Sequence, residues 1–420
     1  MTRDLHAVRR WVEFAIVSAV FFHITGSTFT SLGVVLPFMI EELSWSWTNA
    51  GLGFTLLALL TGLASIAPAW TIRHFGIKAT YAIGGAIMAV GFSLLALTAS
   101  LYEYFLGTSL LGVGFAMCAT VPAVHVLNNL MPDRRSLVIG AYMTIGGLGG
   151  VAGPLVVAGI VGLTDSWRAH WWTMAASILL LTMLCAILVR GVPDTIRGSA
   201  GAAARSKEKH SEKVYYTKDS WRFRDVLRTP QYYVIVAAMT SVLFCAVTMN
   251  TWAVTHMGKL GISTAVAAAA LSAHSAINAL SRVVGGVLAT RIDPKWLLVS
   301  ALVAEILGML ALAVADNLVA IALFAFGEGY AFGMCYFATI MLLVNYFGPD
   351  ENPEILGTLN LITTTAMLGP VLGGFVGDSV GGFGIVFQAY SVIVLLVLIV
   401  TVMMQPPRHP DAARNPSRSG

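Results

Sequence analysis

The chain has 420 residues, of which 57% are hydrophobic and only 11% are charged. Soluble domains carry about 25% charged residues, so this composition excludes an ordinary water-soluble protein and indicates one that lies in a lipid bilayer. The formal net charge of +4 is small, and we expect it to reflect membrane topology and not an affinity for nucleic acid.

Apolar runs follow one another along most of the chain. A run of about 20 apolar residues crosses a bilayer as a helix. We therefore predict an all-α membrane protein with twelve transmembrane helices in two pseudo-symmetric six-helix bundles. To within a few residues at each end, the expected helices cover 12–36, 48–70, 79–98, 103–130, 136–162, 170–190, 230–257, 263–290, 296–315, 318–346, 355–378 and 383–404.

Four segments follow from this pattern. We expect an N-terminal six-helix bundle at residues 1–190, a cytoplasmic linker at 191–229, a C-terminal six-helix bundle at 230–404 and a cytoplasmic tail at 405–420. The linker is polar and rich in Lys and Arg. The tail is rich in Pro, Arg and Ser, a composition that predicts disorder.

The basic residues predict the orientation of the chain. With a cytoplasmic N-terminus, all but three of the 25 Lys and Arg fall in cytoplasmic segments; Arg168 and Lys259 lie outside and Arg282 lies within a helix. This asymmetry follows the positive-inside rule. We expect a multi-pass protein of the plasma membrane, in a bacterium the inner membrane, with both termini cytoplasmic. The first apolar run is too long for a signal peptide, so we expect it to be an uncleaved helix.

The two halves are related by an internal repeat. The offset that places Leu43 on Leu260 aligns the halves without a gap, so that the second to fourth helices correspond to the eighth to tenth. Matched pairs include Ser46 with Ser263, Lys78 with Lys295, Gly91 with Gly308, Gly112 with Gly329 and Met117-Cys118 with Met334-Cys335. Duplicated helical bundles around a central path are typical of secondary transporters.

Two kinds of motif carry a resemblance to the major facilitator superfamily. The loop from Ala69 to Lys78 keeps the Gly76 and Lys78 of that family's loop signature, with Arg73 at its acidic position. A closer resemblance, to the monocarboxylate transporter and oxalate/formate antiporter branch, lies in Gly33-Val-Val-Leu-Pro37 through Trp47, Pro122 to Asn128 with Arg134-Arg135, Gly146 to Pro154, and Asn278 to Arg282. This resemblance implies the major facilitator fold and a small organic anion as substrate.

Arg282 is the only Lys or Arg in the interior of an expected helix, away from the helix ends, and it lies near the middle of the membrane. A charge there costs about 2.5–3.5 kcal/mol on insertion scales, so it normally faces a cavity or an ionic partner. A guanidinium binds a carboxylate through two parallel hydrogen bonds, a geometry that Lys cannot copy. We predict that Arg282 binds a substrate carboxylate. The structural alternative is an ion pair with Glu305 or Glu328.

Other polar residues could complete such a site. His274, Asn278 and Arg282 are four residues apart, so they share one stripe of a helix. Asn278 stands where the resembled monocarboxylate carriers have an aspartate in an Asp-x-x-x-Arg pattern. We predict that Asn278 and His23 contact the substrate together with Arg282; for His23 the alternative is packing within the helices.

The remaining candidates are Tyr336, which we expect to shape the substrate pocket, and two residues that could carry a proton. Histidine is the side chain whose ordinary pKa lies near neutral pH, which makes His274 one candidate, and Glu328 lies near the middle of the membrane on the tenth expected helix. The structural alternatives are a hydrogen bond between helices for His274 and a static ion pair with Arg282 for Glu328.

Several catalytic motifs are absent from the sequence. We find no GxxxxGK[ST] loop, no HExxH and no GxSxG, so we expect neither an ATP-driven pump nor a hydrolase, and no cofactor or metal. The four cysteines lie in apolar helices without a CxxC pair, and we expect them to be packing residues.

The leading hypothesis is a proton-coupled monocarboxylate symporter that works by alternating access. Its expected partners are a small monocarboxylate, protons and the lipid bilayer, and we expect a monomer. One arginine favours a monocarboxylate, since a dicarboxylate carrier should supply two cations. An exporter of hydrophobic or cationic compounds is an alternative, motivated by Glu328 and by the spacing of Gly140, Gly149 and Gly153-Pro154. An organic-anion exchanger and a membrane sensor that does not transport are the others.

Overall fold

The computed structural model describes residues 2–130, 135–189, 214–217, 221–289, 291–348 and 352–409. These residues form helices joined by short turns, and no strand occurs among them, so the predicted all-α class is confirmed. Much of the predicted linker (191–213 and 218–220) and most of the predicted tail (410–420) lie outside the described residues, as does Arg134.

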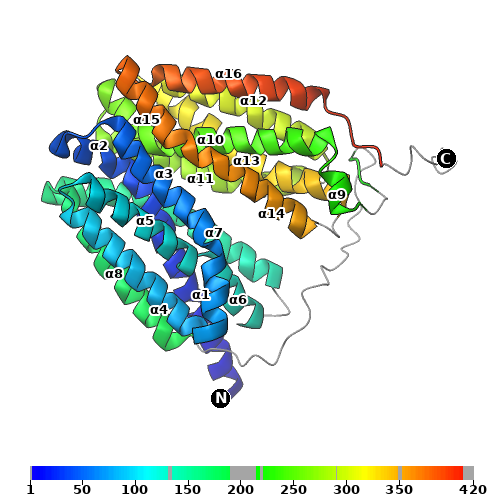
Figure 1. Cartoon of the computed structure of the whole chain (residues 1–420). Coiled ribbons are helices and arrows are strands. Elements are labelled where there is room, and N and C mark those ends of the chain that lie inside the picture. Colours follow the sequence, from blue (N-terminus) through cyan, green and yellow to red (C-terminus); the bar gives the residue numbers. More distant parts are fainter. Residues whose placement is uncertain are drawn as a thin grey trace.

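The first half of the chain forms one group of helices, drawn in blue to green in the lower part of Figure 1. Its elements are α1 (Thr2–Thr25), the π-helical turn η1 (Gly26–Thr30), α2 (Ser31–Leu43), α3 (Trp47–Leu63), the 3-10 turn η2 (Ala64–Ile66), α4 (Ala67–Leu97), α5 (Leu101–Cys118), α6 (Thr120–Leu130), α7 (Arg135–Thr164) and α8 (Trp167–Leu188).

The second half forms the other group, in green to red at the top of Figure 1. It consists of α9 (Phe223–Val226), α10 (Pro230–Lys259), α11 (Thr264–Leu288), α12 (Pro294–Ala313), α13 (Leu318–Phe347), α14 (Asn352–Thr363), the 3-10 turn η4 (Thr364–Leu368), α15 (Gly369–Val380) and α16 (Gly384–Met403). The two groups meet at the left of the view, near α2 and α15.

Ten runs of the described residues are long and apolar enough to cross a membrane. Two features account for the difference from the twelve predicted spans. The run Trp47–Leu97 holds two of the expected helices, because Gly76, with φ 80° and ψ 169°, interrupts α4. The 25-residue α11 carries His274, Asn278 and Arg282, which make it too polar to be counted with the ten.

The helices equated by the repeat begin in the same way. The hydroxyl of Ser46 accepts a hydrogen bond from the first turn of α3, and the hydroxyl of Ser263 does the same for α11. The same offset relates Ser100, which caps α5, to Asn317, which caps α13. Such caps satisfy backbone N–H groups that a helix leaves unpaired at its start. The repeat therefore extends to the local chemistry that sets helix boundaries.

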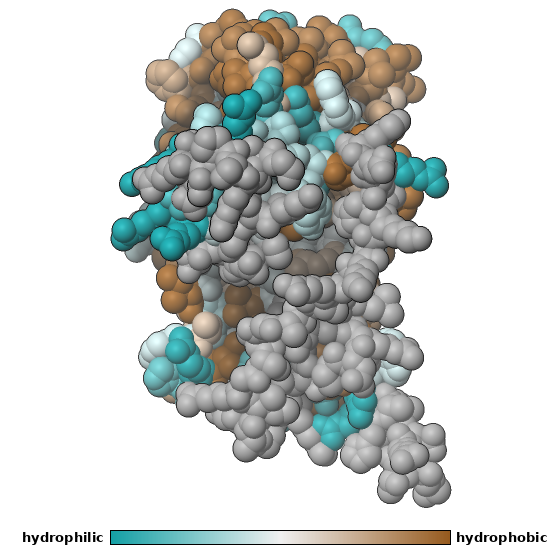
Figure 2. Space-filling model, turned by 90° about the vertical axis from the view of Figure 1, so that its right-hand side faces the viewer, coloured by the Kyte–Doolittle hydropathy of each residue, from teal (hydrophilic) through white to brown (hydrophobic). Residues whose placement is uncertain are grey.

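The outer surface of the second group is apolar. Val392, Leu396 and Met403 on α16 are 57%, 60% and 75% exposed. Figure 2 shows hydrophobic side chains across the top of the molecule, where α16 and α12 lie, and hydrophilic side chains gathered below them. Exposed apolar surface of this extent fits a lipid environment.

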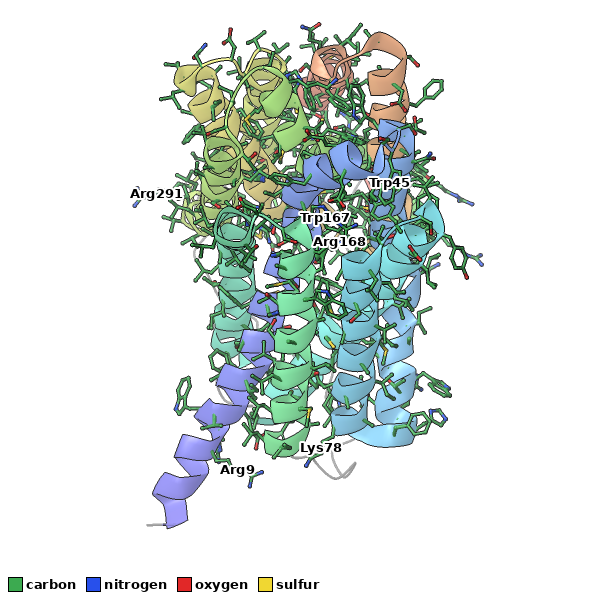
Figure 3. The ribbon with its side chains drawn as sticks, turned by 90° about the vertical axis from the view of Figure 1, so that its left-hand side faces the viewer. Arg9, Trp45, Lys78, Trp167, Arg168 and Arg291 are labelled. Carbon is green, nitrogen blue, oxygen red and sulfur yellow. The ribbon has the colours of Figure 1, made fainter. Side chains whose placement is uncertain are left out.

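The two ends of the first group carry different residues. Arg9 and Lys78 lie at one end, and Trp45, Trp167 and Arg168 lie at the other (Figure 3). At this second end Arg168 forms an ion pair with Glu42, and the Trp167 indole donates a hydrogen bond of 2.6 Å to the same carboxylate. The predicted orientation places the end with Arg9 in the cytoplasm.

Gly76→Ala should destabilise the protein. The backbone of Gly76 combines positive φ with extended ψ, a conformation that costs residues with a Cβ about 1–3 kcal/mol. No atom lies within 4 Å of the added Cβ, so the cost comes from the backbone alone. We expect a lower unfolding temperature in detergent.

Gly159→Ala is the matched control, because Gly159 lies within α7 and also has open space around its Cβ position. It should leave the unfolding temperature unchanged or raise it, since Ala is the better helix former. Equal unfolding temperatures for the two variants would contradict the assignment of backbone strain to Gly76.

Candidate functional site

A central cavity of about 480 Å³ lies between the two groups of helices. Its walls come from α1, η1 and α7 on one side and from α10, α11 and α13 on the other. The polar residues that line it are Thr25, Thr30, Thr144, Asn250, His274, Ser275, Asn278 and Arg282. The volume is that of a small-molecule site, and Arg282 is the only residue with a permanent charge among the described residues of the lining.

The Arg282 side chain is held in place by its neighbours. Its Nε donates a hydrogen bond of 3.1 Å to Oδ1 of Asn278, one turn earlier on α11. Its guanidinium carbon lies 4.8 Å from the ring centre of Tyr336 and 5.8 Å from that of Phe332, both on α13. Aromatic faces attract a cation and fix its plane. The two terminal nitrogens have no hydrogen-bond partner among the described residues, so they remain available to a ligand.

The alternative role for Arg282, an ion pair with Glu305 or Glu328, is not what the structure forms. Within the described part of the chain the ion pairs are Arg9 with Glu13 and Arg168 with Glu42. Both candidate acids are fully buried and outside the cavity lining. The expected competition between Glu328 and a substrate for the same guanidinium therefore has no direct contact to support it.

The other predicted residues divide between the cavity and the helix interior. His274 lines the cavity, is 3% exposed, and has no partner for its Nδ1 among the described residues. Tyr336 is not part of the lining but supports Arg282 from α13. His23 is directed into the first group, where its Nε2 lies 2.6 Å from the Ser177 hydroxyl on α8. The structure therefore does not place His23 in the cavity.

Five polar residues of the wall were not among the predicted site residues: Thr25, Thr30, Thr144, Asn250 and Ser275. Asn250 on α10 and Thr25 on α1 both line the cavity. Asn250 is an amide in the middle of an apolar run, the same kind of signal that singled out Arg282. Thr25 gave no signal of its own, since hydroxyl residues are common in membrane helices, where they bond to backbone carbonyls.

The π-helical turn η1 shapes the opposite wall. The carbonyl oxygen of Gly26 accepts hydrogen bonds from the hydroxyls of Thr30 (3.0 Å) and Ser31 (2.6 Å). Such turns are rare in proteins as a whole, and many of those that occur lie at functional sites. Here the turn brings Thr25 and Thr30 to the same cavity.

The two halves of the chain contact each other near α2 and α15 (Figure 1). Asp378 on α15 accepts hydrogen bonds from the backbone nitrogens of Trp47 (2.9 Å) and Thr48 (2.8 Å) and from the Thr48 hydroxyl. It therefore caps the start of α3 from the other half of the chain. The Lys259 ammonium lies 3.4 Å from the centre of the Trp47 ring and donates to the carbonyl of Gly381.

Small residues let the same two helices touch. A Cβ on Gly51 of α3 would lie 2.8 Å from the carbonyl carbon of Pro370 on α15 and 2.9 Å from the Trp252 ring. The Trp252 indole in turn donates a hydrogen bond of 2.8 Å to the Pro370 carbonyl oxygen. We call the Asp378 cap and this packing the α3–α15 closure.

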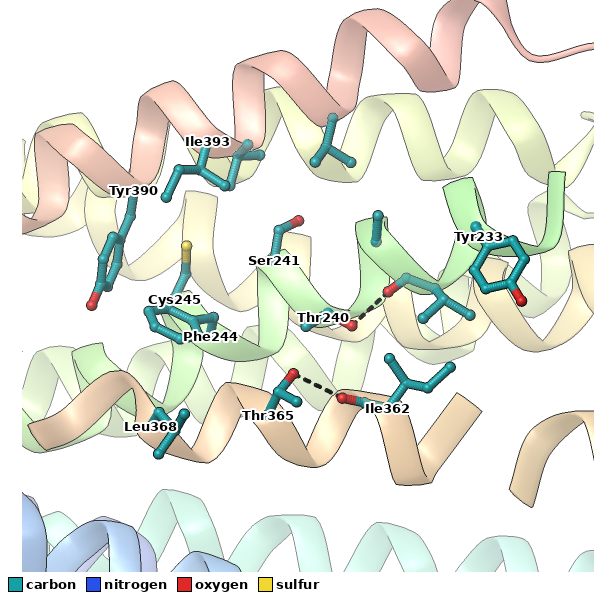
Figure 4. A pocket seen from close by; sticks show the side chains of 14 residues that line it. Tyr233, Thr240, Ser241, Phe244, Cys245, Ile362, Thr365, Leu368, Tyr390 and Ile393 are labelled. Carbon is teal, nitrogen blue, oxygen red and sulfur yellow. Dashed lines mark hydrogen bonds between the residues drawn. The ribbon is translucent and has the colours of Figure 1, made fainter. Parts of the chain in front are cut away.

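A second, larger cavity of about 630 Å³ lies within the second group, between α10, η4 and α16. Its lining residues carry no charge at neutral pH, and the hydroxyls of Thr240 and Thr365 are bonded to carbonyls of their own helices (Figure 4). These hydroxyls cannot donate a hydrogen bond to an anion without giving up those bonds. The central cavity, with both halves and Arg282 in its wall, is therefore the candidate substrate site.

Comparison with known proteins agrees with this architecture. A family model for the Major Facilitator Superfamily matches residues 16–362 and 248–420. The chain belongs to the Major Facilitator Superfamily. It is therefore a membrane transporter and not an enzyme.

Two curated relatives lie in the branch suggested by the sequence. The chain is 24% identical over 276 residues to the oxalate:formate antiporter of Oxalobacter formigenes, and this match covers 62% of each protein. It is 29% identical over 199 residues to monocarboxylate transporter 11 of Homo sapiens, and this match covers 46% of this chain and 40% of that protein. The matches span less than two thirds of either relative.

Solved structures show the same fold. A bacterial homolog of the human lysosomal transporter Spinster, in an inward-facing and occupied conformation, aligns with a TM-score of 0.77 at 17% identity, over 94% of this chain and 96% of that one. The nucleoside transporter NupG aligns with a TM-score of 0.71 at 16% identity, over 93% of this chain and 98% of that one.

Asp378→Ala should open the end of the molecule where α3 and α15 meet. Loss of a helix cap costs about 0.5–2 kcal/mol, which corresponds to about a 2- to 30-fold shift in the balance between closed and open forms. Spin labels on cysteines introduced at Glu41 and Gly258, exposed positions at this end on opposite halves, should report a larger population at long distance.

Asp316→Ala is the matched control, because Asp316 lies in the turn between α12 and α13, where it bonds to the adjacent Asn317. It should leave the distance distribution unchanged. Identical distributions for both variants and the parent would remove Asp378 from the closure.

Proposed function

We propose that this chain is a proton-coupled symporter of small organic monocarboxylates that works by alternating access. The observation that carries the proposal is Arg282: it is the only permanent charge in the cavity wall, and it has no acidic partner among the described residues. A cation held ready in this way favours an anion as the missing partner.

The geometry suits a carboxylate in particular. Asn278 engages Nε of Arg282, which leaves the two terminal nitrogens for the two oxygens of one carboxylate. The hydroxyls of Thr25 and Thr30 come from the opposite half, so a bound substrate touches both halves. Contacts that bridge the halves favour closure around the substrate and link binding to the conformational change.

A single cation favours a single carboxylate. Thr30, which lines the opposite wall of the cavity, supplies a hydroxyl and no second positive charge. A dicarboxylate would leave one buried charge without a partner, which is costly. The same arginine opposes a cationic substrate, so the exporter of cationic compounds is the weaker alternative.

Alternating access follows from the two ends of the cavity. In this proposal the α3–α15 closure seals one end, and the predicted orientation places that end outside the cell. We propose that the linker and both termini are cytoplasmic, so that this conformation receives substrate from the cytoplasm. The bundles at residues 1–190 and 230–404 would then rock about the substrate site.

A proton can accompany the substrate and keep the loaded carrier electrically neutral. His274 lies in the cavity wall one turn before Asn278, so it is the candidate closest to the substrate. Glu328 is buried outside the cavity, where it would act through helix movement and not by contact with the substrate.

Organic-anion exchange is the second candidate, and similarity to the oxalate:formate antiporter favours it. An exchanger reorients only when it is loaded, whereas a symporter also returns empty. Efflux of preloaded labelled substrate into buffer without substrate distinguishes the two: a symporter releases the label, and an exchanger retains it.

Arg282→Ala should abolish gradient-driven uptake of monocarboxylates into vesicles that hold the purified protein. Arg282→Lys keeps the charge but loses the paired hydrogen bonds, and it should lower uptake at sub-saturating substrate at least about tenfold, equal to about 1.4 kcal/mol. Arg291→Lys, at an exposed position between α11 and α12, is the control and should transport normally. Normal uptake by Arg282→Lys would contradict the proposal that Arg282 binds the carboxylate through two parallel hydrogen bonds.

Asn278→Asp should make uptake more dependent on pH. A carboxylate at the position of Asn278 Oδ1, 3.1 Å from Nε of Arg282, would form an ion pair and compete with the substrate. The variant should lose uptake at alkaline pH and recover it as acid protonates the new carboxyl group. Asn278→Ser supplies no competing charge and is the control. A pH profile identical to that of the parent would count against competition at Arg282.

A further inference from the structure

Two acidic side chains lie buried in the second group of helices, away from the central cavity. Glu305 on α12 and Glu328 on α13 have no exposed surface, and neither lines the cavity. All four of their carboxyl oxygens lack a hydrogen-bond partner in the described part of the chain. Buried carboxylates normally have a cation or several donors as partners, so this arrangement requires an explanation.

Close packing of α12 and α13 brings the two acids together. Gly308 and Gly327 meet at the contact: a Cβ on Gly308 would lie 2.7 Å from the backbone nitrogen of Glu328. Glu328 lies close enough to Glu305 for charges on the two to interact, and the thiol of Cys245 on α10 lies beside Glu305. The two carboxyl groups therefore share one region of protein interior, with a thiol as their neighbour from a third helix.

No surrounding group neutralises this pair. The elements packed around the pair carry other titratable or charged side chains: Lys295 on α12; Tyr330, Cys335, Tyr336 and Tyr346 on α13; Tyr232, Tyr233, His256 and Lys259 on α10; His274 and Arg282 on α11; and Tyr390 on α16. None of the Lys, Arg and His residues among them forms an ion pair with either acid in the described part of the chain. If both acids were ionised, their charges would face each other without a counter-ion.

The internal repeat shows what this position needs for folding. Its constant offset equates Glu305 with Met88 and Glu328 with Leu111, and both of these apolar side chains belong to the buried core of the first group. The corresponding helix pair thus packs with apolar side chains in one half. Packing does not require the acids in the other half, which favours a functional role for them.

We propose that Glu305 and Glu328 form a proton-binding site that holds at least one proton at neutral pH. Two ionised carboxylates in an apolar interior lose their hydration and repel each other. Protonation of one acid removes one of the charges and supplies an O–H donor for the other, as in carboxyl pairs that share a proton.

The helices around this pair also form the wall of the central cavity. Glu328 lies one turn before Phe332 on α13, and Phe332 lines the cavity beside Arg282. Cys245 lies five residues before Asn250, the cavity residue of α10. Movement of either helix on substrate binding changes the surroundings of the acids and so their hold on the proton. This coupling role rests on the proposed function, whereas proton binding itself does not.

Infrared difference spectroscopy in lipid vesicles at neutral pH tests the site directly. A protonated carboxyl group has a C=O stretching band that is separate from the carboxylate and amide bands. Subtracting the spectrum of Glu305→Met/Glu328→Leu, which copies the packing of the first half, should leave this band as the contribution of the wild type. Glu41→Gln, which removes an exposed acid, should leave it unchanged.

Equal acid bands in the wild type and the double variant would overturn the proposal. If the double variant fails to fold, Glu305→Met and Glu328→Leu separately keep the test decisive. Each single variant should weaken or shift the band, and two unchanged spectra would again overturn the site.

Uptake measurements separate this inference from the proposed function. With wild type that takes up a monocarboxylate, the double variant should still exchange substrate but lose most of its stimulation by an inward proton gradient. Undiminished stimulation would overturn the coupling role. If the wild type transports no carboxylate, the proposed function fails, and the infrared band alone decides whether the acids bind a proton.

Discussion

The start of α3 depends on a side chain from the other half of the molecule. Backbone N–H groups at a helix start need an acceptor, and here Asp378 of α15 supplies it. Because this contact lies at an exposed end of the helices, water can replace the carboxylate when the halves separate. A similar cap in the apolar interior would leave unpaired N–H groups in hydrocarbon, at a cost of several kcal/mol each. The exposed location of the Asp378 cap therefore makes the α3–α15 closure reversible.

A duplicated scaffold carries unequal chemistry in its two halves. The repeat equates Arg282 with Ser65 and the buried acids with apolar residues. At these positions the second half therefore carries Arg282 and the two acids, whereas the first half contributes hydroxyls and the π-helical turn. Unequal halves suit a carrier in which one bundle grips an ion and the other closes over it, since charges on both sides would repel or pair across the path.

The sequence predicted the features that depend on bulk physical chemistry. Apolar runs placed the helices, and the cost of burying a charge pointed to Arg282 in the cavity wall. It could not show where side chains point: the periodicity around His23 did not reveal its bond to Ser177 on α8. Nor could it show that Glu328 stays apart from Arg282, because that depends on the rotation of α13 against α11. Asn250 was open to prediction, as a lone amide among apolar residues.

The π-helical turn η1 in the first membrane-spanning run changes the direction in which each later residue of that run faces. In an uninterrupted α-helix each residue turns the chain by about 100°, so positions five apart face different sides. Here Thr25 and Thr30 face the same cavity, since the turn accommodates one additional residue. Gly33, which packs α2 against the backbone of Asn250, owes its direction to that residue. Inserting or deleting one residue at this turn would therefore change which side chains line the cavity, even if no other residue were substituted.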